Sequence, residues 1–291
     1  MRVLGPLKKS FIMKSKIFIF ILVLTSSLML ACNQNPSPKT PPIEKPTGDT
    51  TSISVFSFIN EEGMLVKTRF NVPEGYKRIE SAANTWASFL QNLPLKAHGS
   101  QVKLYDGTLK SNTSAYLAVV DLPIGNRNLH QCADAIMRLR ADFFNAQEKY
   151  SEIEFLFVSG TRSNYKTWLG TRQPNAKNYW AYLENVFDGA STLSLNKQLI
   201  HVEADQLQIG DVFIKGRSPG GSPGHAVIVV DKCTNAKGEV KFMLAQSYMP
   251  AQEIEILINP ASPESPWYDL NFGENMISAE WTFTKDQLKR F

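Results

Sequence analysis

A thiol and an imidazole are the first side chains in this sequence whose types and positions suit chemistry. Cys132 falls in the first turn of a predicted helix with Asn128 as its N-cap, where the helix dipole stabilises a thiolate and lowers the thiol pKa. His225 follows Gly224 and opens an apolar strand, so it is the candidate base. Gln246, the first polar residue after the apolar run 242–245 of the next strand, offers an amide oxygen that would accept from the ring N–H and fix the tautomer. Together these residues predict nucleophilic catalysis by a thiol.

Each of these residues also has a purely structural interpretation. Cys132 lies on the apolar stripe of its helix, so a buried and inert thiol is an open alternative. A disulfide between Cys132 and Cys233 is another, because an oxidising compartment permits one. His225 taken alone is equally consistent with a histidine bonded to a loop carbonyl. Asp134 and Asp211 are interpreted as a helix-start residue and a turn residue.

Other chemistries have weaker support. The Gly-rich loop 220–224 lacks the Lys-Ser/Thr of a phosphate-binding loop. The segment 201–205 places three metal-ligand types on one strand face, but no second cluster accompanies it. A glycan hydrolase would need a carboxylate pair, for example among Glu253, Glu255 and Asp269. We therefore expect neither a metal nor an organic cofactor.

Apolar patterns predict the elements that position these residues. Helical spacing of apolar residues predicts helices over 81–92, 128–150 and 178–187. Short apolar or alternating runs predict strands over 115–121, 152–158, 211–215, 225–231, 240–247 and 253–258. Alternation along 225–231 places His225 and Asp231 on the same face. Helices followed by an antiparallel sheet predict an α+β domain, with N-terminal helices packed on the sheet.

Residues 1–31 have the pattern of an export signal. Lys14 and Lys16 precede the apolar run 17–24, which is short for a membrane span. Ala31 followed by Cys32 resembles the lipobox of bacterial lipoproteins, which implies cleavage before Cys32 and lipidation of its thiol. The resemblance implies a lipid-anchored protein of the cell envelope, outside the cytoplasm, with the outer membrane favoured. An uncleaved apolar anchor is the open alternative.

Composition separates this segment from the rest of the chain. The 291 residues carry a formal charge of +4, which becomes −1 without the five basic residues of the first 31. A nucleic-acid-binding protein needs a clustered basic face, and the chain after residue 31 has no basic excess, so its composition does not support nucleic-acid binding. Residues 32–51 are rich in proline and polar residues and predict an extended tether. The chain is 43% hydrophobic, which is a globular composition, and residues 52–291 predict a single α+β domain.

Two sets of motifs resemble known families. The segments 207–214 and 224–231, with Cys132, Asp211, His225 and Gln246 in that chain order, resemble the NlpC/P60 and CHAP cell-wall hydrolases. That resemblance implies a papain-like (NlpC/P60-like) fold and cysteine amidase or peptidase activity, although the chain lacks the usual Asp-Cys-Ser/Gly opening and needs an insertion after Cys132.

A closer resemblance covers nearly the whole domain. Its motifs are Asn92–Leu95, Leu104–Gly107, Gln131–Arg140, Gly221–Val227 and Ala245–Gln252. They are similar to a bacterial lipoprotein family of unknown function, the domain-of-unknown-function family 4846, to which no reaction is attached.

These observations lead to two functional hypotheses. The first is a cell-envelope cysteine amidase or peptidase acting on cell-wall peptide, with Cys132 as nucleophile, His225 as base and Gln246 as its orienting residue. The second is a non-catalytic lipoprotein module that binds a glycan or a protein partner through an inactive shell of the same kind. In both, the expected partners are the membrane through Cys32 and peptidoglycan or a surface glycan, with no nucleic acid.

Overall fold

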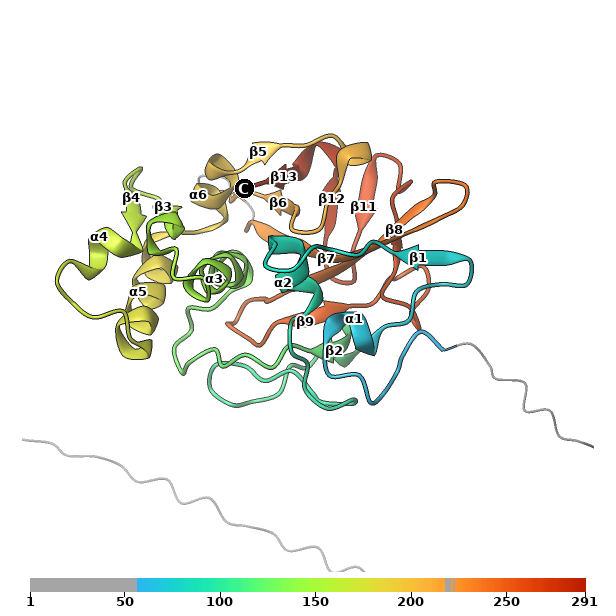
Figure 1. The fold of residues 1–291 in the computed structure, drawn as a ribbon, viewed down its shortest axis with the longest axis horizontal. Helices are drawn as coiled ribbons and strands as arrows, with labels where there is room; N and C mark the ends of the chain where they lie inside the picture. Colours follow the sequence, from blue (N-terminus) through green and yellow to red (C-terminus); the bar gives the residue numbers. More distant parts are fainter. Residues whose placement is uncertain (1–56, 218–220, 222) are drawn as a thin grey trace, which may run out of the picture. The chain divides into compact units, whose positions relative to one another are not determined.

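A computed structural model describes residues 57–217, 221 and 223–291 of the chain (Figure 1). The predicted signal peptide 1–31, the tether 32–51 and Cys32 lie outside these residues. Within them, no helix combines the length and the apolar character that crossing a membrane requires.

A nine-stranded sheet is the main element (Figure 1). Its strands pair in the order β2-β9-β8-β7-β6-β13-β5, with β1 added beside β7 and β10 beside β8, and each of these pairs is antiparallel. The strands are β1 (Tyr76–Arg78), β2 (Tyr116–Val119), β5 (Ile200–His201), β6 (Val212–Lys215), β7 (His225–Asn235), β8 (Val240–Gln246), β9 (Glu255–Leu257), β10 (Tyr268–Asp269) and β13 (Leu288–Arg290). The four consecutive strands predicted after Gly210 are present as β6 to β9.

The central strands are apolar on both faces because each face covers a separate hydrophobic core. Along β7, Ala226 and Ile228 belong to the larger core, whereas Val227 and Val229 belong to the smaller one. This is the alternation that the two-residue period of a strand imposes. The larger core also receives the helices, and the smaller core contains Phe283 from the C-terminal part of the chain.

Six α-helices occur in the described residues, and only two of them are long. They are α1 (Val66–Arg69), α2 (Trp86–Gln91), α3 (Cys132–Asn145), α4 (Tyr165–Leu169), α5 (Ala176–Gly189) and α6 (Thr192–Gln198). The helix α3 packs against β7 and is buried along most of its first two turns. It begins at Cys132 because Gln131 is extended and its N–H donates to the Asp134 carboxylate at 3.0 Å.

Short elements complete the fold. Two further antiparallel pairs are β3 (Glu154–Leu156) with β4 (Arg162–Asn164), and β11 (Asn275–Ile277) with β12 (Thr282–Thr284). Single 3₁₀ turns are η1 (Thr113–Ala115), η2 (Tyr150–Glu152), η3 (Ala204–Gln206) and η4 (Lys285–Gln287).

The expected papain-like α+β fold, with N-terminal helices packed on a sheet, is wrong. The structure is dominated by the nine-stranded antiparallel sheet, and its strands come from both ends of the described chain, from β1 to β13. The helices are few, and all except the four-residue α1 lie between strands in the sequence. The sequence patterns missed β1, β5, β10 and β13 because strands of two or three residues are too short to display alternation.

A β-bulge changes one further expectation. The register of β7 against β8 shifts between Val229 and Asp231. After this shift, the Asp231 carboxylate accepts from Gln91 of α2 at 2.7 Å, so it lies on the helical side of the sheet. Asp231 therefore does not share the face of His225, contrary to simple alternation.

Candidate active site

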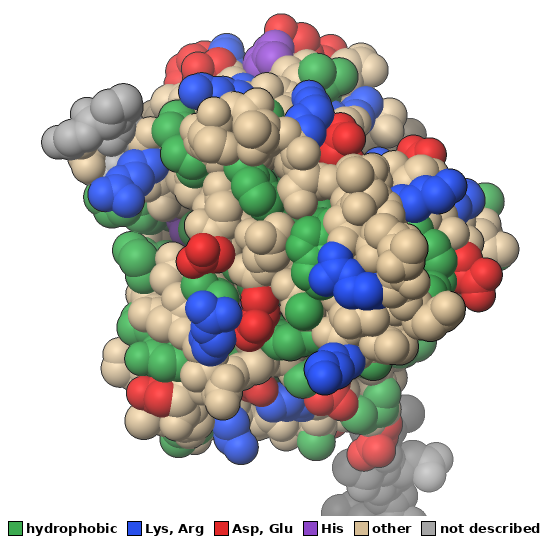
Figure 2. Space-filling model, turned by 90° about the vertical axis from the view of Figure 1, so that its left-hand side faces the viewer, with side chains coloured by type: hydrophobic (Ala, Val, Ile, Leu, Met, Phe, Trp, Pro, Cys, Tyr) green, Lys and Arg blue, Asp and Glu red, His purple; other side chains and the backbone are tan. Residues whose placement is uncertain are grey.

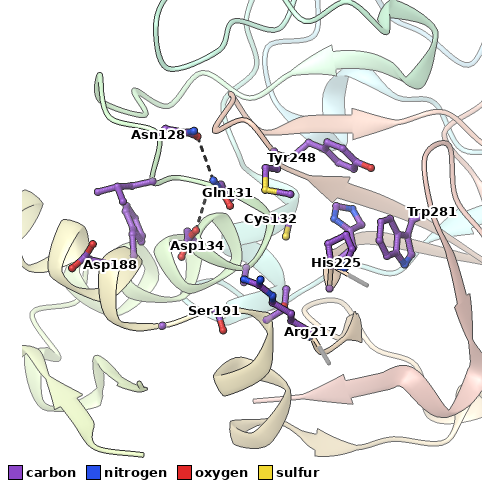
Figure 3. Close-up of a pocket in the computed structure, with 18 of the residues that line it drawn as sticks. Asn128, Gln131, Cys132, Asp134, Asp188, Ser191, Arg217, His225, Tyr248 and Trp281 are labelled. Carbon is purple, nitrogen blue, oxygen red and sulfur yellow. Dashed lines mark hydrogen bonds between the residues drawn. The ribbon is translucent and has the colours of Figure 1, made fainter. Parts of the chain in front are cut away.

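One cavity brings together the two residues selected from the sequence. It has a volume of about 540 Å³, and both Cys132 and His225 line it although they lie far apart in the chain. Figure 3 shows the sulfur at the start of α3 on the side that faces the imidazole. Among the hydrogen bonds of the described residues, none joins this sulfur directly to the ring. The cavity is therefore a place where a ligand would contact both groups.

Cys132 is a buried thiol. The side chain is at the first residue of α3, and the residue is 9% exposed. Burial, and then the nearby Asp134 carboxylate, raise the pKa of the thiol to about 12, although backbone N–H groups of Ala133 and Ala226 act in the opposite direction. The expected lowering of the pKa by the helix dipole is thus outweighed by burial.

The second thiol lies away from the cavity. Cys132 and Cys233 are both free, which excludes the disulfide alternative for this structure. Cys233 is near the far end of β7, where it pairs with Arg78 of β1 and Lys241 of β8. The length of β7 separates the two sulfurs.

His225 is held by one hydrogen bond and lies among three aromatic rings, those of Tyr248, Trp281 and Phe283. It is the first residue of β7 and is 3% exposed. Its Nε2 lies 2.7 Å from Oε1 of Gln246 on the neighbouring strand β8, the partner expected from the sequence. The rings of Tyr248 and Trp281 contact the imidazole, with centroid distances of 4.9 and 5.0 Å. Burial lowers the pKa of His225 to about 4, so the ring is neutral at neutral pH.

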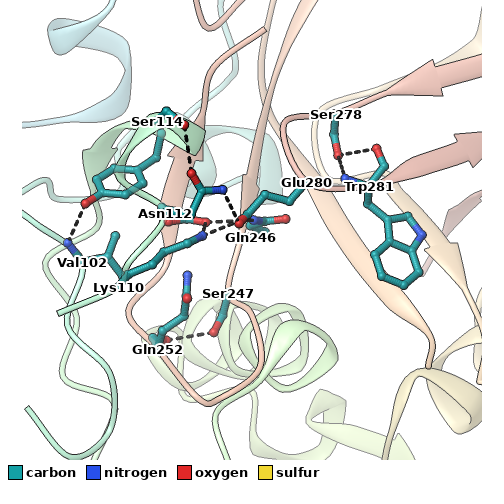
Figure 4. Close-up of polar contacts among 12 residues, drawn as sticks. Val102, Lys110, Asn112, Ser114, Gln246, Ser247, Gln252, Ser278, Glu280 and Trp281 are labelled. Atoms are coloured by element: carbon teal, nitrogen blue, oxygen red, sulfur yellow. Dashed lines mark hydrogen bonds and ion pairs between the residues drawn. The ribbon is translucent and has the colours of Figure 1, made fainter. Parts of the chain in front are cut away.

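A buried polar cluster lies behind Gln246 (Figure 4). The amide Nε2 of Gln246 donates to Glu255 Oε1 at 2.8 Å and to Glu280 Oε2 at 2.7 Å. Lys110 Nζ contacts the same two oxygen atoms, at 2.6 and 2.5 Å. Asn112 donates to the other oxygen of Glu280 at 2.8 Å. Each acceptor atom in the cluster thus receives a donor except Glu255 Oε2, which has no partner.

The turn between β11 and β12 supplies two parts of this arrangement. Trp281 contacts the ring of His225, and the preceding Glu280 contacts Gln246. Ser278 holds this turn by hydrogen bonds to the backbone of Trp281 at 2.8 and 3.2 Å. Sequence reasoning missed both residues because they lie on a short turn more than thirty positions after Gln246. The only available signal was an aromatic residue beside an acid in a short hairpin.

The aspartates interpreted as structural do have structural contacts. Asp211 forms an ion pair with Arg290 and accepts from the backbone of Gln208 at 2.7 Å. Asp134 accepts from Gln131 at the start of α3, as a helix-start residue should. Asp134 also lines the cavity, and burial raises its pKa to about 8.

The loop before α3 contains a buried histidine and differs from the prediction at the N-cap. His130 is fully buried, and its Nδ1 lies 3.3 Å from the carbonyl oxygen of Gln252. Asn128 is not the N-cap, because α3 begins four residues later. Its side-chain oxygen instead accepts from the backbone of Ala251 at 2.8 Å. This bond connects the loop before α3 to the loop after β8, at the mouth of the cavity.

The alternative sites are not assembled in the described part of the chain. No group of three His, Cys, Asp or Glu side chains there is arranged to hold a metal ion. Glu253 pairs with Lys96, and Asp269 pairs with Lys241. Glu255 is buried behind Gln246, so these three acids do not form a carboxylate pair in the cavity.

The walls of the cavity differ in chemistry. The aromatic side chains of Tyr248 and Trp281 lie on the side of His225, and Met249 also lines the cavity. Arg217 is the one Lys or Arg among the described lining residues, and Figure 3 shows its guanidinium extending into the cavity below Cys132. No described residue forms an ion pair with it. This wall suits a ligand with both an apolar part and an anionic group.

On the face of the molecule shown in Figure 2, charged side chains of one sign do not gather into a patch. Basic and acidic side chains of the described residues are interspersed there among polar and apolar ones. This distribution fits the near-neutral charge of the sequence after residue 31.

Comparison with known proteins gives a family match of the kind that the motifs predicted. Residues 66–290 match the family model described as "Domain of unknown function (4846)". No curated protein matches the chain, and no solved structure matches it. The resemblance to NlpC/P60 and CHAP hydrolases and the lipoprotein description gain no support from these comparisons. Since the match extends over most of the 291 residues, the chain belongs to the family described as domain of unknown function 4846.

Proposed function

We propose that this protein is a thiol hydrolase that cleaves amide bonds, with Cys132 as nucleophile and His225 as general base. The observation that carries the proposal is that both side chains line one cavity while Gln246 holds the imidazole through Nε2. This leaves Nδ1 as the ring nitrogen that can accept a proton. A neutral imidazole with a low pKa is in the protonation state that a base needs.

The proposed reaction proceeds through a thioester. As the sulfur of Cys132 bonds to the carbonyl carbon, its proton passes to Nδ1 of His225. The C–N bond then breaks, and the proton passes from His225 to the leaving amine. Water, deprotonated by His225, hydrolyses the thioester and regenerates the thiol. Backbone N–H groups at the start of α3 are the candidates to stabilise the oxyanion.

The walls of the cavity support peptide substrates that carry a carboxylate near the scissile bond. Arg217 would bind the carboxylate, and the aromatic rings of Tyr248 and Trp281 would contact an apolar portion. Cell-wall peptides have this chemistry, and the export signal predicted for residues 1–31 would deliver the protein to them. The proposal thus keeps a cell-envelope location, anchored through lipidated Cys32.

Trapping the acyl-enzyme tests the chemistry. Peptide anilides with and without a carboxylate beside the scissile bond are incubated with the protein, and intact mass spectrometry follows acylation. We expect an adduct on Cys132, none in Cys132→Ala, and at least about a hundredfold slower acylation in His225→Ala. Cys233→Ser is the matched control and should behave like the native chain. Absence of any adduct and of turnover across the panel would contradict the hydrolase.

The same panel tests the substrate class. Arg217→Gln is expected to raise KM about tenfold for the carboxylate-bearing peptide and to leave the other peptide unchanged. An equal effect on both peptides would contradict a carboxylate-binding role for Arg217.

A non-catalytic binding module is the second candidate. The raised pKa of the Cys132 thiol and the missing hydrogen bond to the imidazole favour it. A module of this kind would bind a peptide or glycan in the cavity with equal affinity in the native chain and in Cys132→Ala, without turnover.

A further inference from the structure

The orientation of the Gln246 amide can be deduced from its neighbours. Its Nε2 lies within hydrogen-bonding distance of Glu255 Oε1 and Glu280 Oε2. Both of these atoms also receive a bond from Lys110, whose ammonium group can only donate. A carboxylate oxygen that accepts a hydrogen bond from Lys110 carries no hydrogen of its own, so it can only accept from Gln246 as well. The –NH₂ group of Gln246 must therefore point at the two acids.

Protonation of Glu255 does not change this deduction. Burial raises the pKa of Glu255 to about 7, so part of the population holds a proton at neutral pH. Its Oε2 has no partner, whereas Oε1 already accepts two bonds. The proton therefore resides on Oε2, and Oε1 remains an acceptor in both states.

The direction of the amide then determines the tautomer of the histidine. With the –NH₂ group on the acids, Oε1 of Gln246 faces Nε2 of His225 at 2.7 Å. An amide oxygen can only accept, so Nε2 must carry the hydrogen. In a neutral ring this leaves Nδ1 unprotonated. If the amide were reversed, its N–H would face Nε2 and favour the hydrogen on Nδ1, where it would block the base.

We propose that Lys110, Glu255 and Glu280 are positioning residues that fix the amide of Gln246 and, through it, the Nε2–H tautomer of His225. Lys110 is the centre of this cluster, because it contacts both carboxylates and keeps two acids together beside one amide. All three side chains come from different parts of the chain, and Glu280 is carried by the turn that also presents Trp281 to the imidazole. The importance of this tautomer for catalysis rests on the proposed function, but the tautomer itself does not.

Histidine NMR of the full chain tests the proposal directly. Ring ¹⁵N shifts distinguish a protonated from an unprotonated nitrogen, and the sequence has four histidines. The signals of His225 are assigned by their loss in His225→Gln. We expect the native protein to show a protonated Nε2 and an unprotonated Nδ1 at pH 7. The opposite tautomer in the native protein would overturn the proposal.

A neutral variant of the cluster tests the role of the three residues. Lys110→Met, Glu255→Gln and Glu280→Gln are combined, because the triple change keeps the approximate volume and leaves no unpaired buried charge. The amide side chains that replace the two acids can either donate or accept a hydrogen bond. The amide group of Gln246 is then no longer held in one orientation. We expect a mixture of both tautomers, and kcat lower by about tenfold with KM unchanged.

Further variants make the test decisive. Lys96→Met with Glu253→Gln removes a comparable ion pair that does not contact Gln246, and it should leave the tautomer of His225 unchanged. Glu280→Gln alone keeps the Lys110–Glu255 pair, so Glu255 still accepts from Gln246 and the Nε2–H tautomer should be retained. The same triple change with Lys110→Gln in place of Lys110→Met keeps a polar side chain at position 110 and serves if the first triple variant does not fold. An unchanged tautomer in a folded triple variant would overturn the proposal. A native Nε2–H tautomer without thiol acylation would instead reject only the hydrolase.

Discussion

Cys132 and His225 form a neutral pair, and this determines how the thiol should react. With a pKa of about 12, only a minute fraction of Cys132 is thiolate at neutral pH. The pKa of His225 near 4 excludes a stable imidazolium beside it. Attack on a substrate therefore requires proton transfer during bond formation, as in general-base catalysis, rather than a preformed ion pair.

The alkylation rate of Cys132 should reflect this raised pKa. At pH 8 we expect iodoacetamide to modify it roughly a thousandfold more slowly than an exposed cysteine, with about a tenfold increase per pH unit above that. Peptide mapping measures Cys32, Cys132 and Cys233 separately in the full chain, with circular dichroism confirming the fold at each pH. Rapid modification of Cys132 at pH 7 would show that its pKa is not raised.

The pH dependence of catalysis tests His225. Since only the unprotonated ring is a base, kcat/KM should rise with pH through an apparent pKa near 4 and then stay level through neutral pH. Steady-state kinetics on the peptide anilide from about pH 3.5 to 9 measures this, within the range where the fold is intact. If kcat/KM instead rose through an apparent pKa near 6.5, the ordinary value for histidine, His225 of the substrate-free protein would not be buried as the structure has it.

At the scale of elements, apolar runs in the sequence were informative, and strands outside such runs were not found. The helix α3 and the strands β6 to β9 lie within the predicted apolar segments, and the pairing of β7 with β8 brings His225 next to Gln246. The start of α3 was displaced because Asp134, rather than Asn128, completes the helix start. The raised pKa of Cys132 agrees with the buried-thiol alternative that its place on the apolar stripe left open, and only the packed fold decides between that alternative and an activated thiol.

The remaining part of the site depends on contacts between distant short elements. Lys110 lies in a loop, and Glu280 lies on the turn between two strands of three residues each. No local pattern distinguishes such residues from solvated charges, because their role arises only when the chain packs. The papain-like expectation failed for a related reason, as the Gly-Asp and Gly-His segments describe two strands and not the sheet around them.

Two glycines in those segments have local structural reasons. A side-chain carbon at Gly224 would lie 2.4 Å from the carbonyl oxygen of Lys215 and 2.6 Å from the nitrogen of Arg217. Gly210 has a φ of +99° and lies against the ring of Trp86. The glycines that suggested a hydrolase pattern are thus required by close packing at the ends of β6 and β7.

The start of α3 offers a stability test. Burial raises the pKa of Asp134 from 3.8 to about 8, so between these values the unfolded chain loses a proton that the folded chain retains. The contribution of Asp134 to stability therefore falls as pH rises through this window. Asp134→Asn removes this pH dependence of stability, because asparagine does not ionise. It also keeps a side-chain oxygen that can accept from the backbone N–H of Gln131.

We expect Asp134→Asn to be more stable than the native chain by roughly 2 kcal/mol at pH 8.5, and about equal to it at pH 4. Urea denaturation at the two pH values measures the difference. Equal stabilisation at both pH values would show that the effect is packing and not ionisation.

At the scale of the whole molecule, charge and apolar character are divided along the chain. The basic residues of the first 31 account for the positive net charge, and residues 32–291 have a formal charge of −1. This division is consistent with the predicted export signal: such a segment would engage the membrane, while the remainder has no basic excess that would attract it to anionic lipid or nucleic acid.

Replacement of Cys32 separates the two proposed modes of attachment. If the chain is cleaved before Cys32 and lipidated there, the native protein should fractionate with membranes, and Cys32→Ser should block lipidation and retain the uncleaved precursor. Metabolic labelling with a radioactive fatty acid, together with the intact mass of the purified protein, measures both events. A native protein that is uncleaved, unlabelled and still membrane-bound would identify residues 17–24 as a permanent anchor. The cavity chemistry would be unaffected by that result, because Cys132 and His225 lie in the part of the chain after the tether.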